Sequence, residues 1–334
     1  MPFTMKAYLN FTIVFLLVFT SQLFAEESQL ASKATESLLL DIEKLPNGRL
    51  VTVGERGHVL FSDDQGNSWT QVVVPTNKTL TAVDFVDQHN GVAVGYDQTI
   101  LQTSDGGNSW QLKYQSDAID LPALFDVLMN SEQHIVAVGA FGLYLESKDG
   151  GESWDPLEKD GLADNYGGFS HLYSLVSLSQ QHWIVAGEKY VAGENDDGEE
   201  ISTALLAETH DAGKTWQKIA TPYDGSFFGA KVSKNKEIYI YGLRGNVFIS
   251  RDQGKSWRSL FLSTASGIHD MAFLPNGDWV LVGTGGVLAQ KGTGGSKISK
   301  RKDLKGRAAL VAIDDNTLIV VGEGGVERVA LDDK

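Results

Sequence analysis

The chain has no cysteine and only one short apolar run in its 334 residues, and each absence excludes a class of protein. Without cysteine there are no disulfides, no thiolate nucleophiles and no cysteine metal ligands. A lipid-attached lipoprotein, which needs a cysteine at its processing site, is excluded as well. Positive charge is scarce: 28 Lys and Arg stand against 43 Asp and Glu, a formal net charge of −15. Because duplex binding requires basic side chains that neutralise phosphates, this balance argues against nucleic acid as a partner.

The single apolar run, residues 11–19, lies in a segment typical of an export signal. Lys6 is the only charge among the first 25 residues, and Ala25 is a small residue suited to cleavage before Glu26. The run is shorter than the ~20 apolar residues of an ordinary transmembrane helix. We therefore predict a signal peptide at residues 1–25, with an uncleaved anchor as the alternative. The mature chain, at −16 after the loss of Lys6, is expected to be soluble, without a transmembrane segment, in the periplasm or a compartment like the thylakoid lumen.

An eight-residue motif, Ser/Thr-x-Asp-x-Gly-x-x-Trp, occurs five times. It reads SDDQGNSW at 62–69, TSDGGNSW at 103–110, SKDGGESW at 147–154, THDAGKTW at 209–216 and SRDQGKSW at 250–257. The hydroxyl and carboxylate oxygens can accept backbone N–H groups and fix a turn, the glycine allows a positive φ, and the tryptophan can bury its ring. The structural residues of these Asp-boxes are Asp64, Gly66, Trp69, Asp105, Gly107, Trp110, Asp149, Gly151, Trp154, Asp211, Gly213, Trp216, Asp252, Gly254 and Trp257.

A glycine at the end of a short apolar strand precedes each box and extends the repeat count to seven. These glycines are Gly54, Gly95, Gly139, Gly187, Gly242, Gly283 and Gly322. Each complete unit contains four short strands, and such repeats of roughly 40–45 residues are typical of propeller blades. The sequence predicts an all-β, seven-bladed β-propeller of four-stranded antiparallel blades over residues 38–334.

The seventh unit ends one strand short, while residues 26–37 precede the first unit. We predict that the stretch 29–34 supplies the missing outer strand of the last blade and closes the ring, which would protect an exposed sheet edge. The alternative is that this N-terminal segment is disordered.

The turns between the second and third strands of all blades fall on one face of a propeller. An insert of 14 residues lies there in the fourth unit, within EKYVAGENDDGEEIST at 188–203. Inserts in repeat proteins mark the binding face. We therefore expect one mouth of the ring to bind a partner, and the candidate binding residues are Arg56, Tyr96, Phe141, Lys189 and Arg244.

No constellation of catalytic, metal-binding or cofactor-binding residues is visible in the sequence. The acidic run 194–200 lacks the spacing of a calcium loop, and the seven histidines show no zinc-type pairing. His171 and His269, at the heads of first strands, could reach the central channel, although structural roles are favoured. The basic stretch 291–307 is interpreted as a mobile loop, with contact to anionic lipid or an acidic protein segment as the alternative.

The phrases VGERGHVLFSDDQGNSW at 53–69, VGAFGLYLESKDGGESW at 138–154 and YGLRGNVFISRDQGKSW at 241–257 resemble the repeats of the photosystem II stability/assembly factor family. The resemblance covers residues 38–334. It implies an exported seven-bladed propeller that acts as an assembly factor or scaffold for a membrane-protein complex, with a protein partner, no cofactor and no catalysis. A link to photosynthesis is implied by this resemblance alone. Arg56 and Arg244 match loop positions at which that family is expected to carry arginines.

Sialidases and other glycosidases also carry Asp-boxes and supply the alternative function. Those enzymes bind the substrate carboxylate with three arginines and carry an Arg-Ile-Pro phrase early in the chain, and no arginine of this chain lies in such a phrase. Arg251 lies inside a box and Arg258 directly after one, toward the outer edge rather than the channel. A pair of carboxylates suited to glycoside hydrolysis could still arise among 43 acids. A glycan-binding propeller is the third possibility, for which Tyr96, Phe141, Tyr166 and Tyr190 are the exposed aromatic candidates.

Overall fold

The computed structural model describes residues 26–116, 121–162, 170–194, 200–292 and 295–331. The predicted signal peptide, residues 1–25, and the candidate Tyr166 lie outside the described residues. Within the described ranges, no helix combines the length and the apolar composition needed to cross a membrane.

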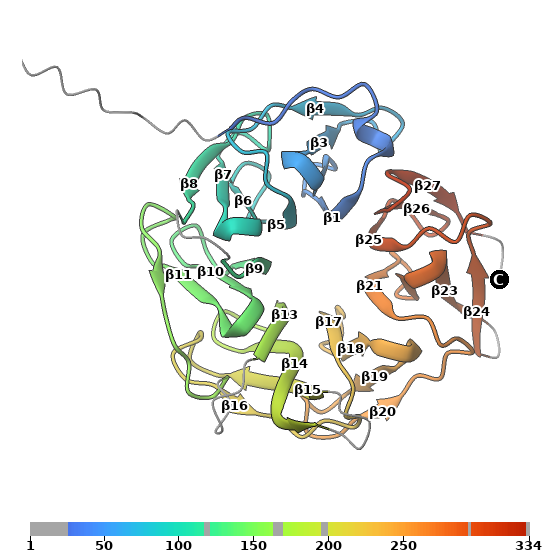
Figure 1. Cartoon of the computed structure of the whole chain (residues 1–334). Helices are drawn as coiled ribbons and strands as arrows, with labels where there is room; N and C mark the ends of the chain where they lie inside the picture. Colours follow the sequence, from blue (N-terminus) through green and yellow to red (C-terminus); the bar gives the residue numbers. More distant parts are fainter. Residues whose placement is uncertain (1–25, 117–120, 163–169, 195–199, 293–294, 332–334) are drawn as a thin grey trace, which may run out of the picture.

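Seven antiparallel sheets stand around a central axis, one for each repeat (Figure 1). Blade one comprises β1 Leu39–Lys44, β2 Leu50–Gly54, β3 Val59–Ser62 and β4 Thr70–Val72. Blade two comprises β5 Leu80–Phe85, β6 Gly91–Gly95, β7 Ile100–Thr103 and β8 Gln111–Tyr114. Blade three comprises β9 Leu124–Met129, β10 Ile135–Gly139, β11 Tyr144–Ser147 and β12 Asp155–Pro156. Blades four and five comprise β13 Ser170–Ser177, β14 Trp183–Glu194, β15 Glu200–Thr209 and β16 Gln217–Lys218; and β17 Phe227–Val232, β18 Ile238–Gly242, β19 Val247–Ser250 and β20 Arg258–Ser259. Blades six and seven comprise β21 Ile268–Phe273, β22 Trp279–Gly283, β23 Val287–Gly292 and β24 Gly295–Lys300; and β25 Arg307–Ala312, β26 Thr317–Gly322 and β27 Glu327–Ala330. The predicted seven-bladed, all-β fold is confirmed.

The core of the molecule lies between neighbouring blades. The second strands are buried along their length, as in β10, because both of their faces are covered by adjacent sheets. Box tryptophans join these layers: Trp154 of blade three packs in one cluster with Val92 of blade two and Leu124 of its own blade. Trp110 packs in the same way between blades one and two. Each such ring therefore covers the boundary with the preceding blade.

The prediction that an N-terminal strand closes the ring is wrong. Residues 26–37 contain a single 3₁₀ turn, η1 Ala34–Glu36, and the seventh sheet has three strands among the described residues. The segment follows the outer strand of blade one instead, where Ser28 N–H donates to the Val74 carbonyl at 2.9 Å, and then reaches blade seven, where Val326 N–H donates to the Thr35 carbonyl at 2.8 Å. Leu30 is 69% exposed and Ala34 is buried, so the stretch lacks the alternating apolar pattern that an added strand needs to cover the sheet. Contacts between β1 and β25 close the ring.

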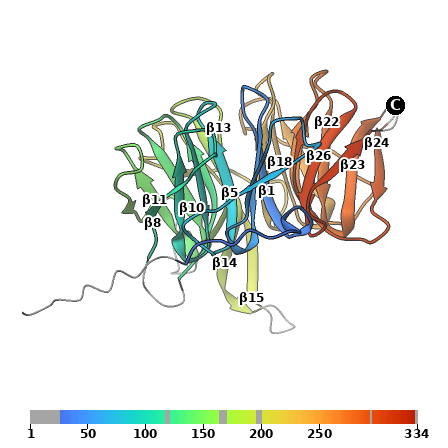
Figure 2. The same cartoon turned by 90° about the horizontal axis from the view of Figure 1, so that it is seen from above.

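Two regions that depart from the repeat, the insert of the fourth unit and the basic stretch 291–307, contain β-strands. The insert of the fourth unit lengthens β14 and β15, whose pairing runs from Trp183 opposite Thr209 to Glu194 opposite Glu200. Figure 2 shows this hairpin extending beyond the ring on one face. The basic stretch 291–307, interpreted as a mobile loop, contains β24, which pairs with β23 as the outer strand of blade six.

Candidate functional site

The turns between second and third strands share one backbone design. They are the 3₁₀ turns η2 Glu55–Gly57, η3 Tyr96–Gln98, η4 Ala140–Gly142, η5 Leu243–Gly245 and η6 Thr284–Gly286. In each, the residue after the strand-ending glycine donates its N–H to the chain entering the same blade, as Ala140 does to the Ala123 carbonyl at 2.9 Å. A Cβ on Gly139 would lie 2.1 Å from that carbonyl oxygen, so the close approach requires glycine. Every turn is thereby fixed at the same mouth of the ring.

The middle residue of each turn adopts a left-handed conformation. Arg56, Asp97, Phe141 and Arg244 have φ between 54° and 57°, whereas blade six has Gly285 at this position. A side chain in this region costs on the order of 1 kcal/mol relative to glycine, and such strain concentrates at functional sites. Four blades thus keep a side chain at the mouth where glycine would be less strained.

The structure places the predicted binding residues around this mouth. Tyr96 and Phe141 are about half exposed, at 51% and 56%, and Leu243 adds a third exposed apolar side chain. Arg56 and Arg244 are exposed, and neither forms an ion pair within the described parts of the chain. Lys189 lies on β14, at the root of the projecting hairpin, where it pairs with Ser170. The mouth therefore combines exposed apolar side chains with two arginines, Arg56 and Arg244, that form no ion pair with the described residues.

A line of aromatic rings leads from the mouth into the channel. Phe141 contacts His171 with ring centres 4.9 Å apart, and its N–H donates to His171 Nδ1 at 3.3 Å. The rings of His171 and Tyr173 stack with their centres 5.8 Å apart, and Tyr173 contacts Phe228 edge-on with ring centres 5.9 Å apart. Burial lowers the pKa of His171, so the ring is neutral at pH 7 and can accept the Phe141 N–H. This arrangement gives an apolar binding surface that continues below the rim.

Carboxylates on the inner strands fasten four of the blades to the next one. Asp126 accepts the N–H of Leu175 in the following blade at 2.7 Å, and Asp84 accepts that of Met129 at 2.7 Å. The same bonds join Asp41 to Val83 at 2.9 Å and Asp270 to Leu310 at 3.0 Å. Ser174 replaces the carboxylate in blade four and accepts the Ala230 N–H at 3.4 Å. These groups line a channel of about 300 Å³ and hold the ring together.

The concentration of acids in the channel shifts their ionisation. Burial raises the pKa of Asp41 to about 6, that of Asp126 to about 7 and that of Glu43 to about 8. Lys231 is the single cation among the described residues that line the channel, and its Nζ lies 3.5 Å from Asp270 Oδ1. The surrounding carboxylates, Asp270 first, raise the pKa of Lys231. Both ring nitrogens of His269 have hydrogen-bond partners: Nδ1 lies 3.0 Å from the Arg307 carbonyl oxygen, and Nε2 lies 3.2 Å from Thr284 Oγ1.

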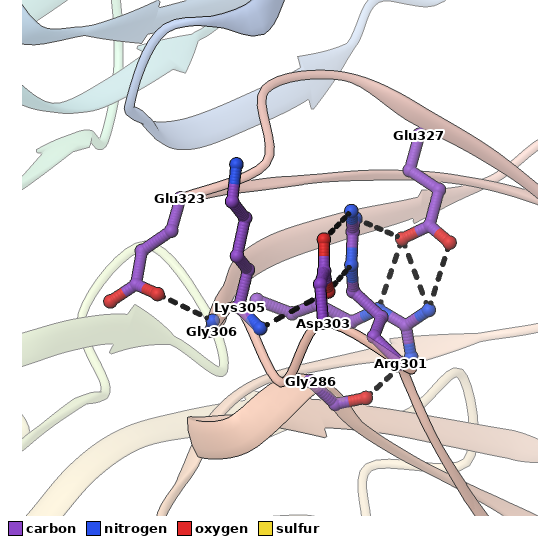
Figure 3. A network of polar contacts seen from close by, with 8 residues as sticks. Gly286, Arg301, Asp303, Lys305, Gly306, Glu323 and Glu327 are labelled. Atoms are coloured by element: carbon purple, nitrogen blue, oxygen red, sulfur yellow. Dashed lines mark hydrogen bonds and ion pairs between the residues drawn. The ribbon is translucent and has the colours of Figure 1, made fainter.

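Arginines of the predicted basic stretch form a clamp between blades six and seven (Figure 3). Arg307 is buried and binds Glu327 at 3.0 Å and the Gly286 carbonyl at 2.9 Å. Arg301 binds the same Glu327 at 2.8 Å and also Asp303 at 2.9 Å. These guanidinium groups are engaged in joining blade six to blade seven, so neither is a free cation for an anionic lipid or an acidic protein segment.

The five Asp-boxes lie on the opposite face, between third and fourth strands. In the fifth box, Gly254 N–H donates to Ser250 Oγ at 2.8 Å, and Asp252 Oδ1 accepts the Ser256 N–H at 2.9 Å. Hydrogen bonds from Ser256 and Ser250 hold the pKa of Asp252 down at about 2. Its carboxylate is thus occupied by its own turn, which is a structural role.

Sequence reasoning missed the aromatic line and the inner carboxylates. Three of the four inner aspartates have a recognisable sequence pattern, the tripeptides LLD at 39–41, LFD at 124–126 and IHD at 268–270, in which an aspartate follows the first strand's leading apolar residue by two positions. The aromatic line has no such sequence pattern, because Phe141 and His171 are 30 residues apart and belong to different blades. Among the described residues that line the channel there is no arginine, so the substrate-binding pattern of a sialidase is absent from that lining.

Fold and site together define a seven-bladed Asp-box propeller whose candidate site is a ring of loops at one mouth. Residues 61–158 match the family model described as photosynthesis system II assembly factor YCF48. The photosystem II assembly protein Ycf48 of Thermosynechococcus vestitus is 26% identical over 226 residues, which cover 67% of this chain and 59% of the relative. The chloroplastic photosystem II stability/assembly factor HCF136 of Oryza sativa subsp. japonica is 25% identical over 242 residues, 68% of this chain and 57% of that protein.

The matches therefore span about three fifths of the length of these curated relatives. A solved structure described as YCF48 bound to D1 peptide superposes with a TM-score of 0.63 at 17% identity, covering 92% of this chain and 97% of that one. At this identity the superposition speaks for the fold. The predicted resemblance to the photosystem II stability/assembly factor family is confirmed by these findings.

Proposed function

We propose that this chain is an exported, non-enzymatic propeller that binds a segment of a membrane-protein subunit at the mouth formed by η2, η3, η4 and η5, and that it acts as an assembly or stability factor for that subunit's complex. The observation that carries the proposal is the left-handed backbone of Arg56, Asp97, Phe141 and Arg244 at one mouth. Glycine, as in blade six, would relieve the strain at these positions, so the side chains kept there favour a role in binding.

The composition of the mouth suits a peptide. Half-exposed aromatic rings provide large contact area at low entropic cost, and arginines are enriched where protein partners are bound. Tyr96, Phe141 and Leu243 supply the apolar surface, and Arg56 and Arg244 supply charge for an acidic residue or a terminal carboxylate. The relatives named above are assembly factors of photosystem II, and one solved neighbour holds a D1 peptide, which supports a protein partner of this kind.

The test is co-purification from cells after chemical crosslinking, with a C-terminal tag on the chromosomal gene. Arg244→Glu reverses the charge at the mouth, and Arg258→Glu makes the same change on the exposed outer strand β20 of the same blade. We expect the unsubstituted protein and the Arg258→Glu variant to recover the same membrane-complex subunits, and Arg244→Glu to recover at least about tenfold less. Equal recovery with both variants contradicts the assignment of this mouth.

The alternative function, a glycan-binding protein or a glycosidase, predicts that no protein partner is recovered and that the pure protein binds or cleaves glycans. If no protein is recovered and the pure protein retains or cleaves glycans, the assembly proposal fails. The channel carboxylates with raised pKa values are the groups that such an activity would need, but Asp41, Asp84 and Asp126 are already engaged with backbone N–H groups of the next blade.

A further inference from the structure

A cluster of two histidines and one glutamate lies in blade four, at the face opposite the proposed binding mouth. His182 Nε2 is 2.9 Å from Glu208 Oε2, and His210 Nε2 is 3.2 Å from the same oxygen. The two imidazole rings lie side by side with centres 4.1 Å apart. Among the described residues this is the one group of three potential metal ligands whose donor atoms all lie within 4.8 Å of one another.

Three fixed elements position these side chains. His182 ends the turn between β13 and β14, where its N–H donates to Ser179 Oγ at 3.1 Å and its carbonyl accepts the Leu178 N–H at 2.8 Å. Glu208 lies on β15, paired with Ile184 on one side and Gln217 on the other. His210 is the second residue of the Asp-box, whose turn is held by Thr209 and Asp211. The donor atoms therefore converge without depending on a mobile loop.

Other blades have a fixed cation at this place. In blade one Arg49 binds Asp63 at 2.7 Å, and in blade five Arg251 binds Glu237 at 2.7 Å. Blade three is the nearest match, because His134 and Glu146 occupy the positions of His182 and Glu208. There Lys148 takes the position of His210 and binds the carboxylate at 3.1 Å. Blade four alone of these four blades replaces the permanent cation with a second imidazole.

We propose that His182, Glu208 and His210 form a three-ligand site for a divalent transition-metal ion, with Zn²⁺ as the preferred ion. Two imidazoles and one carboxylate are a ligand set that zinc uses, with a fourth position left open. Ligand atoms about 2.1 Å from a tetrahedral ion are about 3.4 Å apart. The observed nitrogen–oxygen separations of 2.9 and 3.2 Å need to widen by only a few tenths of an ångström, and the donor nitrogens of the two histidines lie within 4.8 Å of each other.

Exposure of the cluster gives an ion a route from solvent. The side chains of His182 and Glu208 are 13% and 19% exposed, whereas that of His210 is 61% exposed. The inner two ligands are thus shielded and His210 is exposed to solvent, so water or a donor from another molecule could complete the coordination shell. A bound ion would link the β13–β14 turn to the end of β15 at the base of the fourth blade and stabilise it by mass action.

The test is Zn²⁺ binding to the full chain, purified without a polyhistidine tag and treated with a chelator, measured by isothermal titration calorimetry. His210→Lys is the matched variant, because it recreates the arrangement that blade three uses and keeps a partner for Glu208. His89→Lys makes the same substitution at an exposed histidine outside the cluster. Thermal unfolding in the presence of chelator verifies that both variants fold like the unsubstituted protein.

We expect one Zn²⁺ per chain, an affinity at least roughly tenfold lower in His210→Lys, and an unchanged affinity in His89→Lys. A Glu208→Gln variant, which keeps the shape of the side chain, is expected to lose affinity as well. With Co²⁺ as the probe, the tetrahedral absorption band should appear in the unsubstituted protein and vanish in His210→Lys. Absence of stoichiometric binding, or equal affinity in His210→Lys and the unsubstituted protein, overturns the proposal.

Discussion

Glu43 faces the channel from the inner strand of blade one, and replacing it with glutamine should change how stability depends on pH. Burial, followed by the charges of Asp84 and Asp41, raises its pKa from 4.5 to about 8, and Lys231 opposes the shift. The folded chain therefore holds this proton more tightly than the unfolded chain does. The resulting stability is fully present below pH 4.5 and is lost as the pH rises through about 8.

Linkage gives the size of the effect. For a carboxyl whose pKa moves from 4.5 to about 8, the free energy of unfolding falls by about 2.5 kcal/mol between pH 5 and pH 7 and by about 1.4 kcal/mol more by pH 9. Glu43→Gln carries no titrating group and escapes this loss. The variant should match the unsubstituted protein near pH 4 and exceed its stability increasingly at pH 7 and 9.

Urea unfolding at pH 5, 7 and 9, followed by tryptophan fluorescence, measures the difference. Asp41 and Asp126 titrate in the same direction but are present in both proteins, so their contributions largely cancel in the comparison. Glu132→Gln, at an exposed acid on a turn, is the control and should leave the pH profile unchanged. If the difference in the free energy of unfolding between Glu43→Gln and the unsubstituted protein is the same at all three pH values, the raised pKa of Glu43 is refuted.

Three further predictions concern stability and are checked by the same urea titrations. Trp154→Ala removes a ring that is 7% exposed between blades two and three, and should lower the free energy of unfolding by about 3–5 kcal/mol. Trp154→Phe should restore most of this loss, and a loss below about 1 kcal/mol in Trp154→Ala contradicts the packing of the ring between the blades. Glu327→Gln leaves the buried Arg307 without its counter-charge and should cost about 3 kcal/mol, whereas Glu36→Gln, in an exposed pair, should cost less than about 0.5 kcal/mol. Arg244→Gly relieves the left-handed backbone and should be about 1 kcal/mol more stable than Arg244→Ala, which retains the strain; equal stabilities argue against strain at the mouth.

The architecture was predictable because its determinants are local and repeated. Each box, such as that at 250–257, contains within eight residues the hydroxyl, carboxylate and glycine that form its turn. The strand-ending glycines are equally local, since a Cβ at Gly139 would meet the carbonyl of the chain entering the same blade. Seven strand-ending glycines and five boxes, repeated along the chain, leave little choice of fold.

Ring closure depended on a feature that the repeat does not encode. The last blade lacks a strand, and the simplest inference from counting was that residues 29–34 supply it. The segment instead binds by its backbone and by side chains such as Gln71, whose Oε1 accepts the Ala31 N–H at 2.8 Å. The junction of blades six and seven was equally unpredictable, because Arg307 binds Glu327, which is 20 residues away in the sequence, and no local pattern marks this pair.

The location of the candidate site followed from topology, but its composition did not. Arg56, Tyr96, Phe141 and Arg244 lie at the predicted mouth because every turn between second and third strands faces that way. The contact of Phe141 with His171, and the convergence of His182 with His210, join residues that are about 30 positions apart. Such meetings depend on how adjacent strands and blades pack and are visible only in three dimensions.

The most direct test of the account is photo-crosslinking in living cells from a defined position on each face. A photoreactive phenylalanine analogue replaces Phe141 at the mouth, or Lys255 in an exposed Asp-box turn on the opposite face. The account predicts that the analogue at Phe141 captures a membrane-complex subunit, that the analogue at Lys255 does not, and that Arg244→Glu abolishes the capture. Capture of the same subunit from Lys255, with nothing captured from Phe141, contradicts the central claim that this mouth binds the partner.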